Sequence, residues 1–153
     1  EINSIAREIR ARGHAHRAEL FLLEKSKANE TLAAKFNVAA NTYLFHSVML
    51  HFEDGEPIQV EERWVNPNVA PEYLQQDFSR TTPNEYLLEN VPLQSGEYTV
   101  EALPAPEAIA EMLYIKRNEA CLVLQRKTLS MNQIATLVTM WHPGARYQFS
   151  GKI

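Results

Sequence analysis

The side chains best suited to binding a small charged molecule fall in one stretch, residues 42–67. Within it, Glu61 and Arg63 are two residues apart, so on a β-strand they project from the same face and place a carboxylate beside a guanidinium. His51 lies across an Asp-Gly turn and comes near these charges if the faces match. This pattern indicates either a polar binding site or a solvated strand face that carries a weak ion pair.

Other polar and aromatic residues are weaker candidates on pattern alone. Thr136 and His142 have the same parity in the last long apolar run, so on a strand they share a face. Tyr86 lies near the start of a predicted helix, where it either faces a ligand or packs in the core. Taken singly, residues of these kinds are more often structural polar or core residues than ligand contacts.

The sequence contains no recognisable set of metal ligands and no catalytic motif. His14 and His16 have strand spacing, but a metal site needs a third ligand, and neither a cysteine partner nor a second ligand pair accompanies them. Cys121 lies within an apolar run, which predicts a buried and inert thiol. No nucleophile elbow, phosphate-binding glycine loop or His-Glu-x-x-His motif is present. We therefore expect no metal, no cofactor and no catalytic residue.

A predicted β-hairpin positions the candidate residues. Two β-favouring runs flank an Asp-Gly pair, which supplies the positive φ of a tight turn. The first arm, residues 43–52, is apolar on both faces, which predicts an interior strand. The second arm alternates, which predicts one face with Ile58, Val60 and Trp64 and the other with Gln59, Glu61 and Arg63.

The rest of the chain predicts an α+β fold with a mostly antiparallel sheet and helices packed on it. Helices are expected over residues 1–12, between an Asn29 N-cap and Asn37, after a capping box that begins at Thr82, and after Ala105. Strands are expected over residues 18–24, 97–103 (half-buried), 120–129 and 134–141, the last two as a hairpin. Residues 146–149 are expected to close the sheet.

Bulk properties limit the kind of partner. The 153 residues fit one domain, and a net charge of −4 provides no basic field for nucleic acid. One cysteine cannot form an internal disulfide, and no secretory signal or membrane-spanning run is visible, so a cytoplasmic setting is expected. The chain begins without methionine in a helical pattern, which is typical of a domain from a longer protein.

Several segments in order carry a resemblance to a known family. They are Ala11-Arg12-Gly13-His14, HFEDGEPIQVEERWVNP from His51, QDFSRTTPNEYL from Gln76, TVEA from Thr99 and WHPGARY from Trp141. On these segments the chain resembles the UTRA effector-sensing domain of GntR-superfamily transcription regulators of the HutC type. The resemblance covers nearly the whole chain.

The resemblance implies a chorismate-lyase-like α+β fold and a ligand-sensing domain that forms a homodimer. It implies that residues 1–12 end a linker helix from a missing N-terminal winged-helix domain and that residues 13–153 form the sensing domain. Operator DNA would be contacted only through that missing domain. For the branch that regulates histidine utilisation, the implied small-molecule effector is urocanate, which relieves repression.

The resemblance also assigns site residues. The family's pocket glutamate matches Glu61, and polar and tyrosine positions at the start of the middle helix match Asn84 and Tyr86. Where sugar-phosphate sensors of the family carry two arginines, this chain has Met49 and His51, and that loss of charge-assisted clamps argues against a phosphate ligand.

Two further positions depart from the family pattern. Thr136 replaces a common pocket carboxylate, and His142 replaces a usual tyrosine. For urocanate, Glu61 would accept the ring N–H, while Arg63, or alternatively Arg126, would bind the carboxylate. Aromatic walls are expected from Tyr86 or Trp141.

Three functions remain open at this stage. The first is a non-catalytic sensor, for urocanate or for another small carboxylate. The second is a lyase-like enzyme, because the implied fold is shared with one. The third is a structural dimerisation module with a degenerate pocket.

Overall fold

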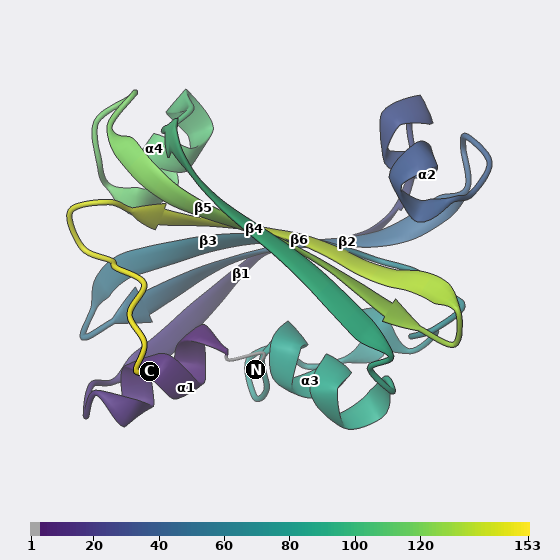
Figure 1. Cartoon of the computed structure of the whole chain (residues 1–153), viewed down its shortest axis with the longest axis horizontal. Coiled ribbons are helices and arrows are strands. Elements are labelled where there is room, and N and C mark those ends of the chain that lie inside the picture. Colours follow the sequence, from purple (N-terminus) through teal and green to yellow (C-terminus); the bar gives the residue numbers. More distant parts are fainter. Residues whose placement is uncertain (1–3) are drawn as a thin grey trace.

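A six-stranded antiparallel sheet forms the centre of the computed structural model, which describes residues 4–153 (Figure 1). The strand order is β1-β2-β3-β6-β5-β4, and every neighbouring pair is antiparallel. The predicted α+β fold is therefore confirmed. The strands are β1 (His16–Lys27), β2 (Tyr43–Glu53), β3 (Glu56–Val65), β4 (Ser95–Pro104), β5 (Ala120–Ser130) and β6 (Gln133–Pro143).

Helices cover both sides of the sheet. Helices α2 (Glu30–Phe36) and α4 (Glu107–Leu113) lie on one side at opposite ends, and α1 (Ile5–Ala11) and α3 (Pro83–Asn90) lie on the other side (Figure 1). A short 3-10 turn, η1 (Tyr73–Gln75), precedes α3. None of the helices in residues 4–153 is long and apolar enough to cross a bilayer.

The helix ends follow the predicted caps. The side chain of Asn29 accepts a hydrogen bond from the Leu32 amide, and α2 ends at Asn37 in the left-handed conformation. At α3, the Thr82 hydroxyl accepts from the Glu85 amide at 3.1 Å. The first helix begins after Ser4 and buries Ile5, Ala6 and Ile9, while residues 1–3 of the predicted helix lie outside the described residues. These three helices are confirmed within the described range.

The β2–β3 hairpin is confirmed, but its register shifts next to the turn. Asp54 and Gly55 both have positive φ, at 49° and 84°, as a two-residue hairpin turn requires. A bulge between His51 and Phe52 leaves Ile58 out of register, and Ile58 packs against α1 rather than on the face that holds Val60. The bulge thus brings the start of β3 into contact with α1.

Two predictions about the sheet are wrong. Strand β4 is not half-buried: it is an edge strand exposed along nearly its whole length, with Tyr98 and Val100 at 71% and 43% exposure. Residues 146–149 do not close the sheet, because the chain leaves it after Pro143. Instead, Tyr147 and Phe149 pack their rings against His142. Periodicity alone does not reveal whether another element covers a strand or pairs with it.

Candidate functional site

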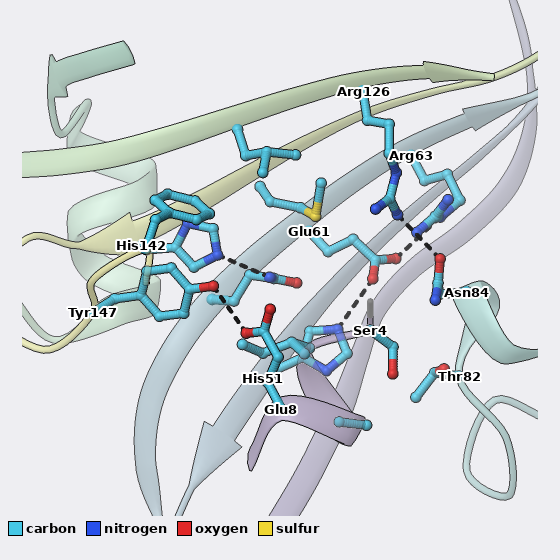
Figure 2. A pocket seen from close by; sticks show the side chains of 16 residues that line it. Ser4, Glu8, His51, Glu61, Arg63, Thr82, Asn84, Arg126, His142 and Tyr147 are labelled. Carbon is cyan, nitrogen blue, oxygen red and sulfur yellow. Dashed lines mark hydrogen bonds and ion pairs between the residues drawn. The ribbon is translucent and has the colours of Figure 1, made fainter. Parts of the chain in front are cut away.

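A pocket lies on the side of the sheet that carries α1 and α3 (Figure 2). Its walls come from the start of α1, the start of α3, strands β2, β3, β5 and β6, and the segment after β6. The free volume is about 40 Å³, which is room for about three water molecules. The pocket joins seven segments of the chain, from the start of α1 to the segment after β6.

Glu61 on β3 is the central charge of the pocket, and its side chain is 3% exposed. Its two carboxylate oxygens lie 3.1 Å from His51 Nε2 and 3.4 Å from Arg63 Nε. Burial raises the pKa of Glu61, but the Arg63 charge and the hydrogen bonds from His51 and Arg63 outweigh burial and lower that pKa to about 2. Glu61 is therefore a buried carboxylate that can only accept hydrogen bonds.

A chain of hydrogen bonds runs outward from Glu61 through two histidines. Because ionised Glu61 accepts, His51 donates through Nε2–H, and its Nδ1 forms a hydrogen bond of 2.9 Å with His16 Nε2. Burial and the nearby His51 lower the pKa of His16 to about 4, so His16 is neutral near pH 7. Both ring nitrogens of His51 are thus committed to the protein.

At the opposite side of the pocket, His142 is fixed in the same way. Its Nδ1 donates to the Leu122 carbonyl at 3.0 Å, so its Nε2 accepts from Gln59 Nε2, also at 3.0 Å. Burial lowers the pKa of His142 to about 4, which keeps the ring neutral. The Tyr147 ring stacks on His142 at 4.0 Å, and its hydroxyl donates to Glu8 of α1 at 2.9 Å. These contacts close the pocket between α1 and the C-terminal segment.

The third group of polar residues is cationic. Arg126 Nη2 on β5 donates to Asn84 Oδ1 at 3.0 Å, at the start of α3. Burial, with repulsion from Arg63, lowers the pKa of Arg126 to about 10, so the guanidinium stays charged at neutral pH. Within residues 4–153, Arg126 forms no ion pair and Asn84 Nδ2 is buried without a hydrogen-bond partner. Asn84 Nδ2 is thus a buried donor without an acceptor, next to a guanidinium without an anion, and an acceptor group of a ligand would satisfy both.

The structure brings together five of the seven predicted site residues, namely His51, Glu61, Arg63, Asn84 and His142. Thr136 lies in a neighbouring cavity, with its hydroxyl 2.6 Å from that of Thr128. Tyr86 packs against Tyr73 and Phe78, which is the core alternative.

The expected aromatic wall at Trp141 is wrong. Trp141 packs against the cluster under α4, on the other side of the sheet, because odd positions of β6 face away from the pocket. Tyr147 and Phe149 supply the aromatic wall instead. The sequence does not single out these two residues or Glu8 as pocket residues, because the alternation of Tyr147 and Phe149 predicts a strand instead.

The candidate metal ligand His14 and the single cysteine, Cys121, lie outside the pocket. His14 lies 2.6 Å from Glu53, and no group of three or more His, Cys, Asp or Glu side chains in residues 4–153 is placed to hold a metal ion. Cys121 is 1% exposed, and burial raises the pKa of its thiol, as expected for an unreactive cysteine.

Comparison with known proteins identifies the family. Residues 11–148 match the UTRA domain model, so the chain belongs to the UTRA domain family. The predicted resemblance to the effector domains of GntR-superfamily regulators, and to histidine utilisation repressors among them, is confirmed.

Individual relatives are consistent with this assignment. The chain is 41% identical over 152 residues to the histidine utilization repressor of Pseudomonas putida, covering 99% of this chain and 61% of that protein. The crystal structure of the C-terminal domain of the histidine utilization repressor from Pseudomonas syringae pv. tomato is similar with a TM-score of 0.87 and 37% identity, covering 91% of this chain and 99% of that one. The effector domain of PhnF from Mycobacterium smegmatis has a TM-score of 0.88 at 14% identity, covering 98% and 94%, which shows the fold alone. The chain spans about three fifths of the length of the curated relatives it matches.

Proposed function

We propose that this chain is the ligand-sensing and dimerisation domain of a cytoplasmic bacterial repressor of histidine utilisation genes, with urocanate as its effector. Identity of 41% to proteins named as histidine utilization repressors supports the biological process. The pocket supports a binding role rather than catalysis, because Glu61, His51 and His142 are all held in hydrogen bonds within the protein.

One observation carries the ligand class. Arg126 is half-buried and the Asn84 amide is buried, neither has an anionic partner in residues 4–153, and both line a pocket whose central group, Glu61, is an acceptor. A small carboxylate with a ring N–H matches both requirements, and urocanate has these two groups at its two ends. The pocket has room for about three water molecules, fewer than the non-hydrogen atoms of urocanate, so we expect urocanate binding to widen it.

The wall that moves links the pocket to DNA binding. Ile5 and Glu8 of α1 and its N-cap residue Ser4 line the pocket, whereas β3, which carries Glu61, is paired with a strand on each side. In our proposal, residues 1–12 end a linker helix from a winged-helix domain, and a bound effector shifts this helix and releases operator DNA. Such a shift requires that urocanate bind the two positions of α1 with different affinity.

The proposed homodimer uses surface outside the pocket. Strand β4 exposes Tyr98 and Val100 at the sheet edge, and uncovered apolar edges commonly pair with another chain. Sedimentation velocity is expected to give a molar mass near twice the 17.5 kDa of the chain. A monomer at micromolar concentration would remove the dimer from the proposal and leave the pocket unaffected.

Isothermal titration tests the effector assignment. Urocanate is expected to bind saturably with one site per chain, and its methyl ester, which lacks the anionic group, is expected to bind at least tenfold more weakly. Chromatography of urocanate after incubation is expected to recover it unchanged. Heat equal to that of dilution would transfer the assignment to another small carboxylate or to a structural module, and turnover of urocanate would establish an enzyme.

A further inference from the structure

The acceptor end of the pocket offers two oxygens on one face of β3. Glu61 is ionised and accepts only, since His51 and Arg63 already donate to it. Gln59 uses its amide nitrogen on His142 Nε2, so its carbonyl oxygen is the end of the side chain that is left to accept from a ligand. Neither histidine can supply a donor here, because the protein occupies both nitrogens of each ring.

The spacing of residues 59 and 61 along β3 suits a ring with two N–H groups. Residues 59 and 61 alternate with residue 60 on a strand, so their side chains start about 6.7 Å apart. In a doubly protonated imidazole ring the nitrogens are about 2.2 Å apart and point outward, so hydrogen bonds of about 2.8 Å place the two acceptors about 7 Å apart. A neutral ring would turn one lone pair toward an oxygen and leave that acceptor unsatisfied.

The charges that line the pocket are balanced but separated. Two are negative, Glu8 and Glu61, and two are positive, Arg63 and Arg126. Figure 2 shows Arg126, Arg63 and Asn84 grouped at one end and Glu8 with Tyr147 at the other, with Glu61 between them. A ligand with a net charge would leave that charge uncompensated in a buried site, whereas a dipolar ligand preserves the balance.

We propose that the pocket selects a zwitterion: an imidazolium ring that donates its two N–H groups to Glu61 and Gln59, joined to a carboxylate held by Arg126 and the Asn84 amide. This inference rests on the proposed function, because it deepens the ligand chemistry of the same site. It makes proton uptake part of effector recognition, since a free imidazole ring is mostly neutral above pH 7.

The titratable groups of the protein around the ring are the other possible sources of a change in bound protons. They come from every element around it and are Glu8, His16, His51, Glu61, Arg63, Arg126, His142 and Tyr147. The pKa values of Glu61, His16, His142 and Arg126 lie at about 2, 4, 4 and 10, outside the range from pH 6 to 8. His51 is held at both nitrogens, and the test below separates its protonation from that of the ligand.

The test is calorimetry of urocanate binding to the wild-type chain at pH 8 in two buffers with different heats of ionisation. With an ordinary ring pKa of about 6.5, binding is expected to take up nearly one proton, and Kd is expected to rise about eightfold from pH 7 to pH 8. The matched ligand 3-(2-furyl)acrylate has the same carboxylate and no basic nitrogen, so its binding is expected to take up no proton. The ¹⁵N spectrum of bound, labelled urocanate is expected to show both ring nitrogens protonated.

The possible results distinguish failure of the zwitterion proposal from failure of the proposed function. Binding of urocanate without proton uptake, or with one unprotonated ring nitrogen, would overturn the zwitterion while the effector assignment stands. Proton uptake with furylacrylate would place the proton on the protein and overturn the inference as well. Absence of urocanate binding would instead contradict the proposed function itself. A Gln59→Met variant is expected to lower the proton uptake at pH 8, and Glu62→Gln, on the opposite face of β3, is the matched control.

Discussion

Replacing Arg126 with glutamine is expected to weaken urocanate binding by about 100-fold without lowering the stability of the domain. A charge-assisted contact to a buried carboxylate contributes about 2–5 kcal/mol when one partner is removed. The guanidinium is mostly buried, has no ion pair in residues 4–153 and is repelled by Arg63. Its removal therefore removes the desolvation and repulsion energies that destabilise the folded domain when no ligand is bound. Titration calorimetry measures the loss of affinity, and urea unfolding measures the unchanged or increased free energy of unfolding.

The adjacent Lys127→Gln variant is the control for Arg126. Lys127 carries the same charge, is 37% exposed, projects from the other face of β5 and lies 3.9 Å from Glu97. Its replacement is expected to leave Kd within about twofold, because screened surface charges contribute little. Unchanged binding by Arg126→Gln would show that Arg63 holds the carboxylate, which is the other arginine that the sequence indicated.

Replacing Glu61 with glutamine is expected to be strongly destabilising, by about 3–5 kcal/mol, because it leaves Arg63 as a buried cation without its anion. The double variant Glu61→Gln with Arg63→Met is expected to recover part of that loss, since it removes the stranded charge as well. Urea unfolding at pH 7 measures both, with Glu62→Gln as a surface control at 46% exposure. A double variant less stable than the single one would contradict this account of the ion pair.

The Glu61–Arg63 ion pair makes the free energy of unfolding depend on pH. The fold lowers the pKa of Glu61 from 4.5 to about 2, so the unfolded chain binds the proton more readily. This stabilisation is fully present above pH 4.5 and is lost as the pH falls toward 2. The difference in free energy of unfolding between wild type and Glu61→Gln is therefore expected to shrink over that interval.

Local sequence determined the elements and the orientation of the central strand. The Asp-Gly turn, the caps at Asn29 and Thr82, and the alternation on β3 each depend on residues close together in the chain, so they could be predicted from backbone chemistry. The alternation also predicted that Gln59, Glu61 and Arg63 share a face. It did not determine whether that face is solvated or buried, because burial depends on α1 and α3.

Tertiary structure alone decided which side chains complete the pocket and which charge states they take. Arg126 and His16 come from strands far from Glu61 in sequence, and Tyr147 reaches the pocket because the chain leaves the sheet after Pro143. Thr136 has the predicted parity but lies in the next cavity, since parity fixes a face and not a position along it. Desolvation and neighbouring charges act through space, so no sequence pattern could give the low pKa of Glu61 or the neutral ring of His142.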